Sequence, residues 1–326
     1  MNKYTALLAV LVFAQAPVIA NAQPNEKTPV IGYIDSLLPA QSKPYRDAFD
    51  QVLRERGWIE GKTVITQYRS TAGRPDQYAA LAAEVVGLKV NLIVAGGDAF
   101  LLTLKKTTST IPIVMTGVGD PVGSGIVASL ARPGGNITGM SNLAVGLPGK
   151  WIGLLKEMSP RITRVAILRN TANPTHDIFV KEAESGAVQL KTTLIGIGYK
   201  IAAELDDAIA RIVAEKAMAV LILPDPIVNV NSKQIAALTL RYKLPSAELY
   251  REGIAAGGLL SYGPNRLDNY RRAADYVDRI LRGAKPGDLP VQQPVKFDLF
   301  VNSNTAKALG ISVPQSVLLQ AEEVIR

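Results

Sequence analysis

The chain has 326 residues, of which 48% are hydrophobic, and this is enough for two compact domains or one large one, so global disorder is excluded. The formal net charge of +8 comes from Lys and Arg residues scattered singly along the expected helices, and only 6% of residues are aromatic. We therefore interpret the charge as favouring solubility and expect no nucleic-acid partner.

The first 22 residues have the features of an export signal. Lys3 supplies a positive charge, residues 6–13 form an apolar run too short to cross a bilayer, and Ala20-Asn21-Ala22 matches a small-x-small cleavage site. The mature chain is expected to begin near Gln23. The chain has no cysteine for lipid attachment, so we predict a periplasmic protein that is not lipidated, the alternative being a membrane anchor.

Strands and helices alternate through the first half of the chain. The helix expected at 44–56, for example, has apolar residues at helical spacing and ends at Gly57. The expected strands are 30–35, 63–68, 91–95 and 111–116, and the other expected helices are 76–88 and 98–107. This alternation favours a parallel sheet with right-handed crossovers.

The same order of elements restarts after a Gly/Pro-rich passage at 133–148. The expected strands are 164–168, 192–197, 219–223 and 245–249, and the expected helices are 175–190, 205–216 and 230–242. The repeat lies in the order of elements and not in aligned identities, so it indicates architecture only.

These patterns predict an α/β fold with two Rossmann-like lobes, each with a parallel sheet, joined by a hinge of about three crossover segments. Residues 261–263 and a helix at 267–281 are interpreted as a return to the first lobe. The N-terminal lobe would then be 29–141 plus 261–289 and the C-terminal lobe 142–260 plus 290–326, although the pattern leaves the lobe of 290–326 open. Ligands of such sheets bind beyond the carboxyl ends of the strands, which here face one cleft.

Carboxylates follow four of the expected strands. They are Asp35, Asp98, Asp120 and Asp225, and glycines beside them allow a ligand close to the backbone. Each aspartate can also be an ordinary helix N-cap. Four around one cleft favour a zwitterion, with its ammonium on Asp and its carboxylate on the N–H groups that begin the following helices.

Polar and aromatic residues at other strand ends complete the candidate site. Amides and a hydroxyl open the helix at 175–190, where a plain turn is the alternative, and Tyr250 is a candidate aromatic wall, where core packing is the alternative. Asn142 and Glu252 lie where the chain should cross between lobes. The candidate ligand-binding residues are Asp35, Ser36, Gly96, Gly97, Asp98, Gly119, Asp120, Asn142, Asn170, Asn173, Thr175, Asp225, Tyr250, Glu252 and Ser261.

Enzyme motifs are weak. Residues 123–128 match a dinucleotide fingerprint, but they follow a turn and not the first strand of a unit, so we interpret the match as chance. No G-x-S-x-G elbow is present, and with no cysteine and the single His176 a Cys-His pair or a multi-histidine metal cluster is excluded. We expect no catalysis, cofactor or metal, and we place His176 at the surface or cleft edge; a secreted α/β enzyme would need a base beyond the carboxylates.

Two stretches carry a family likeness, Arg-Pro-Gly-Gly-Asn-Ile-Thr-Gly at 132–139 and Gly-Gly-Leu-Leu-Ser-Tyr-Gly at 257–263. With the segments at 29–33, 57–62, 119–122 and 289–294, they resemble the ABC-transporter substrate-binding family that includes tryptophan/tyrosine-type binding proteins and has the type I periplasmic-binding-protein fold. The likeness covers nearly the whole mature chain.

The resemblance implies a receptor that closes on its solute and delivers it to an inner-membrane permease. Relatives commonly carry Asn at the position of Asp35 and Thr at that of Asp98, so this chain favours a solute with a positive group. The leading hypothesis is a monomeric periplasmic solute-binding protein of an ABC importer that binds a small amine-bearing or aromatic, amino-acid-like solute. The alternative is a sensory receptor that presents its ligand state to a membrane histidine kinase.

Overall fold

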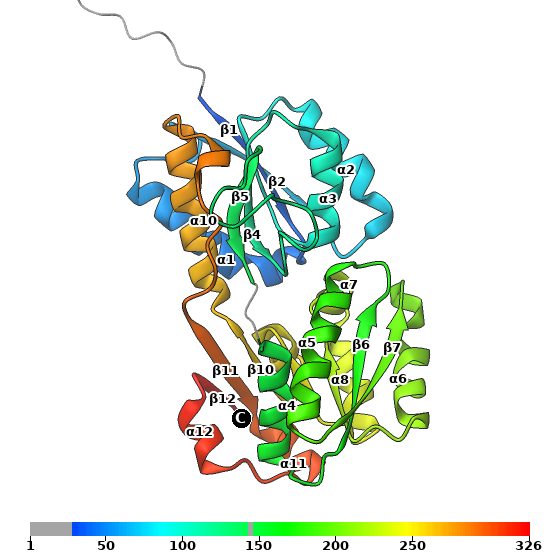
Figure 1. Cartoon of the computed structure of the whole chain (residues 1–326). Helices are drawn as coiled ribbons and strands as arrows, with labels where there is room; N and C mark the ends of the chain where they lie inside the picture. The colour runs from blue at the N-terminus through cyan, green and yellow to red at the C-terminus, as the bar shows by residue number, and fades with distance from the viewer. Residues whose placement is uncertain (1–27, 143–145) are drawn as a thin grey trace, which may run out of the picture.

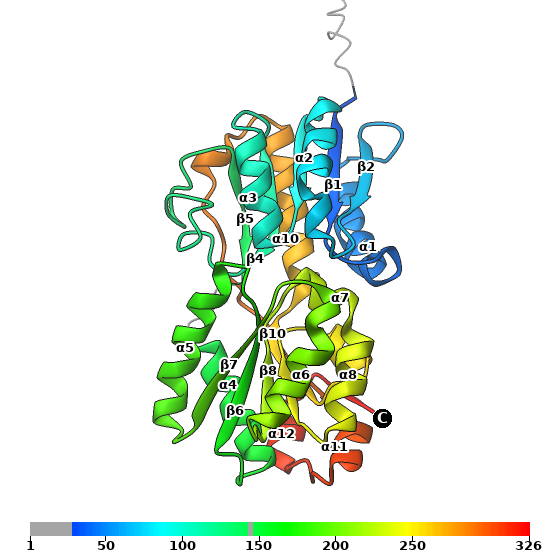
Figure 2. The same cartoon turned by 90° about the vertical axis from the view of Figure 1, so that its right-hand side faces the viewer.

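The computed structural model describes residues 28–142 and 146–326, which form two α/β lobes joined at a narrow waist (Figures 1 and 2). The predicted export signal at 1–22 lies outside the described residues. Among the described helices, none is both long and apolar enough to cross a membrane.

The first lobe contains a parallel five-stranded sheet in the order β2-β1-β3-β4-β5. Its strands are β1 (Val30–Asp35), β2 (Ile65–Ser70), β3 (Leu92–Ala95), β4 (Ile113–Val118) and β5 (Ile137–Ser141). Helices α1 (Pro39–Glu55) and α10 (Arg266–Leu281) cover one face of the sheet, and α2 (Tyr78–Gly87) and α3 (Asp98–Thr107) cover the other.

The second lobe contains a seven-stranded sheet in the order β12-β11-β10-β9-β8-β6-β7, in which only the β10–β11 pair is antiparallel. Its strands are β6 (Arg164–Asn170), β7 (Thr193–Tyr199), β8 (Ala219–Ile222), β9 (Ser246–Glu248), β10 (Leu260–Pro264), β11 (Phe297–Asn302) and β12 (Glu323–Ile325). The strands within residues 290–326, β11 and β12, thus belong to the second lobe.

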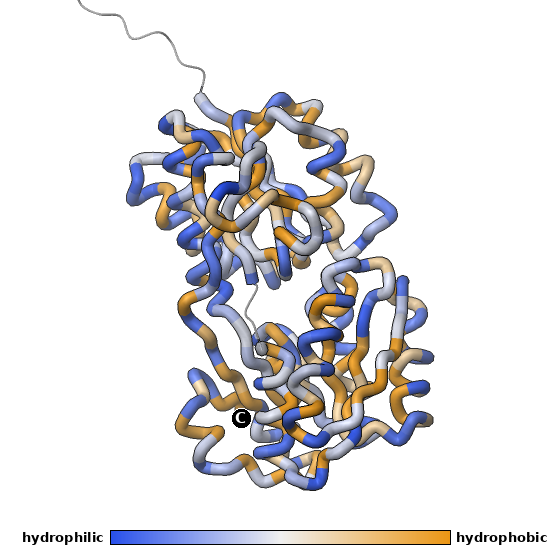
Figure 3. The backbone as a smooth tube through the Cα atoms, in the orientation of Figure 1, coloured by the Kyte–Doolittle hydropathy of each residue, from blue (hydrophilic) through white to orange (hydrophobic). Residues whose placement is uncertain are grey.

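Helices cover both faces of the second sheet, and hydrophilic and hydrophobic residues alternate along them (Figure 3). Helices α4 and α5 pack on one face, and α6, α7 and α8 on the other. The helices of this lobe are α4 (Leu147–Met158), α5 (Thr175–Gln189), α6 (Leu205–Ala214), α7 (Pro226–Val230), α8 (Ser232–Arg241), α9 (Arg251–Ala255), α11 (Ser303–Leu309) and α12 (Gln315–Gln320). The short 3-10 turns are η1 (Pro75–Gln77), η2 (Ala202–Glu204) and η3 (Pro286–Asp288).

The chain passes between the lobes after β5, between β10 and α10, and between η3 and β11. The assignment of residues 261–264 to the first lobe is wrong, because β10 pairs with β9 and β11 and its Leu260 is buried in the core of the second lobe. The chain leaves that sheet at Asn265, whose side chain accepts a 2.8 Å hydrogen bond from Asp268 N and caps α10.

Most expected elements begin and end within two residues of the observed ones, and three segments differ by more. Helix α1 begins at Pro39, which occupies its first turn, where a proline is well tolerated. Pro44, the expected start, lies inside the helix. The Gly/Pro-rich passage contains β5 and the first two residues of α4, and the helix expected at 230–242 is α8, which a second helix, α7, precedes.

Candidate ligand-binding site

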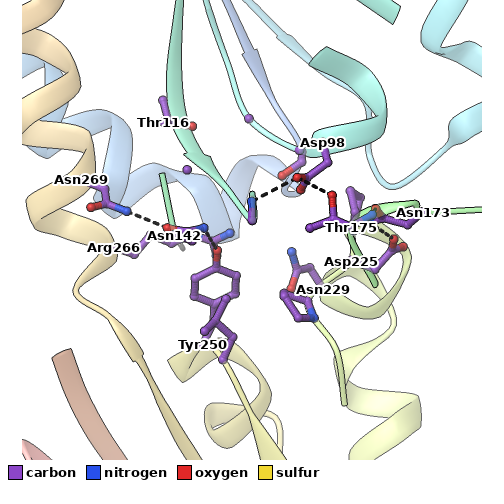
Figure 4. Close-up of a pocket in the computed structure, with 18 of the residues that line it drawn as sticks. Asp98, Thr116, Asn142, Asn173, Thr175, Asp225, Asn229, Tyr250, Arg266 and Asn269 are labelled. Carbon is purple, nitrogen blue, oxygen red and sulfur yellow. Dashed lines mark hydrogen bonds between the residues drawn. The ribbon is translucent and has the colours of Figure 1, made fainter. Parts of the chain in front are cut away.

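A cavity of about 50 Å³ lies between the lobes, where the carboxyl ends of both sets of parallel strands meet (Figure 4). Ten of the fifteen candidate residues from the sequence line it: Ser36, Gly96, Gly97, Asp98, Gly119, Asn142, Asn173, Thr175, Asp225 and Tyr250. The two lobes therefore present strand-end residues to one space, as the doubly wound pattern predicts.

Asp98 lies between the two lobes as the first residue of α3. Its Oδ1 accepts hydrogen bonds from Gly119 N at 3.1 Å and from Thr175 Oγ1 of the second lobe at 2.8 Å. Burial raises the pKa of Asp98 to about 6, although the bond from Thr175 favours the charged form. No other described side chain bonds to this carboxyl, which faces the cavity (Figure 4).

The lobes touch closely beside this carboxyl. A Cβ added to Gly119 would lie 2.4 Å from Thr175 Cγ2, so only glycine allows this approach without a shift. Gln41 Nε2 also donates to Asn229 O of the second lobe at 3.2 Å, and Tyr45 Oη donates to Glu252 Oε1 at 2.9 Å. The two lobes are therefore in contact, and the cleft between them is nearly closed.

Asp225 is a helix cap that also holds the far wall in place. Its Oδ1 accepts from Ile227 N at 3.0 Å, and its Oδ2 accepts from the amides of Asn170 and Asn173 at 3.2 and 3.3 Å. Asn173 Oδ1 in turn accepts from Thr175 N at 3.1 Å. With both oxygens engaged, Asp225 positions the wall and has less capacity for a solute than Asp98.

The structure does not bring Asp35 and Asp120 to the cavity. Asp35 Oδ1 accepts from Leu37 N at 2.9 Å, and Asp120 Oδ1 accepts from the N–H groups of Val122 and Gly123 at 3.0 and 2.9 Å. Their carboxylates satisfy backbone donors at the turns after β1 and β4, so the alternative of a local cap describes both.

Three further candidates lie outside the cavity. Asn170 bonds to Asp225 and to Ala172 N, and Glu252 forms an ion pair with Arg266 at the hinge. Ser261 is fully buried within the second sheet, and its hydroxyl has no hydrogen-bond partner among the described residues.

The wall nearest the hinge combines amides, an aromatic ring and a cation. Asn142 Nδ2 donates to Tyr250 Oη at 2.6 Å, and Asn269 Nδ2 donates to Asn142 Oδ1 at 2.9 Å (Figure 4). The guanidinium of Arg266 lies 3.8 Å from the centroid of the Tyr250 ring. The Arg266 and Glu252 side chains are each only 13% exposed, so their ion pair is well shielded from water.

The sequence pattern of the ABC transporter substrate binding proteins matches residues 39–325, most of the chain. The chain belongs to this family. The family is one of binding proteins, so a solute cleft is its functional site, and the protein is a solute-binding protein of an ABC transporter.

Three relatives extend the comparison. A tyrosine-binding protein of Clostridioides difficile is 26% identical over 268 residues, which are 82% of this chain and 76% of that protein. A conserved domain protein of Vibrio cholerae has a crystal structure 27% identical, with a TM-score of 0.85 over 91% of this chain and 100% of that one. The structure of a Streptococcus pneumoniae domain in complex with L-Trp is 22% identical, with a TM-score of 0.85 over 92% of this chain and 100% of that one.

Several cavity residues of this family member were not identified from the sequence. Arg266, Asn269 and Tyr270 come from the first turns of α10, which begins where β10 ends at the cleft, and Phe179 and Asn229 come from α5 and α7. The only available signal was the position of α10 after a strand. The assignment of residues 261–264 to the first lobe obscures this signal.

His176 lines the interlobe cavity of this binding protein, so its expected place at the cleft is confirmed, but it is buried and does not lie at the surface. Its Nδ1 accepts from Asn170 N at 2.9 Å, which leaves Nε2 to donate to Pro224 O at 3.1 Å. Burial lowers the pKa of His176, and the ring is neutral. The described residues contain no group of three or more His, Cys, Asp or Glu that could hold a metal ion.

Proposed function

We propose that the protein is the periplasmic receptor of an ABC importer for an amino acid with an aromatic side chain. The observation that carries the proposal is the polarity of the interlobe cavity, which has the carboxyl of Asp98 on one wall and the guanidinium of Arg266 over Tyr250 on another. A zwitterion has the complementary pair of charges.

Each part of such a solute has a partner among the cavity residues. The α-ammonium would bind Asp98, and the α-carboxylate would face the Arg266 side of the cavity. The rings of Phe179, Tyr250 and Tyr270 would pack against the aromatic side chain. The names of two relatives support this assignment, because one binds tyrosine and another was crystallised with L-Trp.

Binding requires the lobes to move. The present cavity of about 50 Å³ is far smaller than the roughly 300–1,000 Å³ typical of ligand pockets. A rotation about the three crossover segments would admit the solute and then close on it. The direct contact between Thr175 and Asp98 is expected to break or rearrange when the solute enters.

The family and the predicted export signal support the proposed location and transport partner. We propose that the signal at 1–22 directs the protein to the periplasm and that the closed, loaded form is recognised by an inner-membrane permease. Monomeric behaviour remains a prediction, to be checked by light scattering of the purified mature chain.

Isothermal titration calorimetry of the chain beginning at Gln23 tests the proposal. L-Tyr, L-Trp and L-Phe are compared with tyramine, which lacks the carboxylate, and with 3-(4-hydroxyphenyl)propanoate, which lacks the ammonium. We expect tight binding of an amino acid and weak binding of both truncated compounds, because the propanoate leaves Asp98 without a cation and tyramine loses the contact of its missing carboxylate with the Arg266 side of the cavity. If the propanoate binds as tightly as the amino acids, the proposed role of Asp98 is contradicted. If none of the three amino acids binds, the proposed class of solute is contradicted.

A further inference from the structure

A second carboxyl lies just behind the cavity. Glu248 ends β9 two residues before Tyr250, is only 8% exposed, and its carboxyl makes no hydrogen bond to another described residue. A buried polar group without a partner lowers the stability of the folded state. Folding alone therefore gives no reason for a glutamate at this position.

Two glycines leave room for this side chain. A Cβ added to Gly253 would lie 1.7 Å from Glu248 Oε2, and a Cβ added to Gly258 would lie 2.4 Å from Glu248 Oε1. Neither atom could be placed there without moving the carboxyl. On the neighbouring strand β10, Ser261 pairs in register with Glu248, and its hydroxyl is also buried and without a partner among the described residues. The local structure thus holds free hydrogen-bonding capacity around the carboxyl.

The Glu248 carboxyl adjoins a small cavity that shares a wall with the interlobe cavity, called the solute cavity below. The small cavity has a volume of about 10 Å³ and is lined by Glu248, Ser232, Asn229 and Tyr250. Pro224, Asn229, Leu249 and Tyr250 line both cavities, so these four residues form the partition between the two spaces. The Asn229 side chain makes no hydrogen bond to another described residue, and Figure 4 shows it directed toward the solute cavity.

The Glu248 carboxyl is neutral at neutral pH, because burial, with a smaller contribution from the charge of Glu252, raises its pKa to about 8. A neutral carboxyl has one O–H donor and acceptor capacity on both oxygens. Its best match is a neutral group that also donates and accepts, which is a hydroxyl. An indole N–H only donates, and a phenyl ring does neither.

We propose that Glu248 is a specificity-determining residue that exchanges hydrogen bonds with a hydroxyl at the end of the solute's aromatic side chain, as in tyrosine. The aromatic side chain of the solute passes the partition when the Asn229 side chain moves aside, and the phenol hydroxyl of the solute then reaches the small cavity. This inference rests on the proposed function, since it assumes that the solute is an aromatic amino acid. The inference adds to the proposed function a preference for a solute with a phenol side chain over one with a phenyl side chain.

The test compares L-Tyr with L-Phe on the wild type, Glu248→Gln and Glu248→Met by calorimetry. We expect the wild type to prefer L-Tyr by at least about tenfold, because a site that hydrogen-bonds a hydroxyl rejects the analogue lacking it. Glu248→Met should abolish the preference while keeping the affinity for L-Phe, and Glu248→Gln should keep part of it. Glu184→Gln, which replaces an exposed carboxyl on α5, is the matched control and should keep the full preference.

Thermal unfolding provides a second readout. Glu248→Met should unfold at the same or a higher temperature than the wild type, because it removes an unpartnered buried carboxyl. If L-Tyr and L-Phe bind the wild type tightly and equally, or if Glu248→Met keeps the preference, the inference is overturned while the proposed function stands. If no aromatic amino acid binds the wild type, both are overturned.

Discussion

Thr175 Oγ1 donates a 2.8 Å hydrogen bond to Asp98 Oδ1, and the two residues begin helices on opposite lobes. The same carboxyl faces the solute cavity and also accepts from Gly119 N. A solute ammonium that binds Asp98 would therefore act at the point where the lobes meet. Under the proposed function, solute binding and lobe closure would in this way be connected through one side chain.

Replacement of Asp98 by Asn tests its role as the ammonium partner. The amide keeps the size and a hydrogen-bonding oxygen but loses the charge, so we expect the affinity for an amino acid to fall by about 1.5–3 kcal/mol, or roughly tenfold or more. Calorimetry measures this change. Asp120→Asn is the matched control, because that carboxylate caps a turn away from the cavity, and its affinity should equal that of the wild type. An unchanged affinity in Asp98→Asn would exclude the ammonium contact.

The raised pKa of Asp98 predicts opposite effects of pH on stability and on binding. Its folded-state pKa of about 6 lies above the ordinary value of 3.8, so its contribution to stability is fully present below pH 3.8 and is lost as pH rises through 6. Binding of an ammonium needs the ionised carboxylate, so affinity should fall as pH drops through 6. Titrations between about pH 5 and pH 7.5 check this prediction. In Asp98→Asn the fall should be absent; a wild-type affinity that is flat over this range would contradict the assignment.

The sequence correctly predicted which polar residues follow the strands, but it did not distinguish those that line the cavity from those that bond to nearby backbone. Asp98, Asn173 and Thr175 reach the cavity because the carboxyl ends of parallel strands meet there, and this follows from the order of elements. Asp35 and Asp120 occupy equivalent places in the pattern, but their carboxylates turn back to nearby N–H groups. A pattern of residue types cannot separate these outcomes, since the same aspartate suits a cap and a ligand contact.

Residues of α10 and the buried Glu248 were beyond the reach of sequence patterns for a different reason. Arg266 reaches the cavity only because α10 returns to the first lobe after β10, which is a long-range feature of the fold. Glu248 is buried because Gly253 and Gly258 leave space beside it, and no local periodicity reports such a contact. The lobes could be predicted from alternation, whereas their mutual contacts depend on packing.

Replacement of Gly119 by Ala tests whether close approach of the lobes is required. The added methyl would lie 2.4 Å from Thr175 Cγ2, so the lobes could not reach the present separation. We expect weaker solute binding and a larger radius of gyration at saturating solute in small-angle X-ray scattering. Thr175→Ser removes the clashing methyl and keeps the hydroxyl, so Gly119→Ala with Thr175→Ser should recover most of the affinity.

Gly153→Ala is the control for the glycine substitution itself. No atom lies within 4 Å of a Cβ added at this position in α4, so its scattering and affinity should match the wild type. If Gly119→Ala binds solute as tightly as Gly153→Ala, the contact at Thr175 is not needed for the bound state.

The ion pair between Arg266 and Glu252 predicts a strongly non-additive effect on stability. Each side chain is 13% exposed, and Tyr45 Oη also donates to Glu252. Arg266→Met leaves the Glu252 carboxylate buried without its cation and should cost about 3–5 kcal/mol, whereas Arg266→Met with Glu252→Gln should cost much less, because the uncompensated charge is gone. Urea unfolding of the wild type, both single variants and the double variant gives the coupling energy. Additive losses would show that the two side chains stabilise the hinge independently, and the guanidinium would then be held over Tyr250 by packing and not by Glu252.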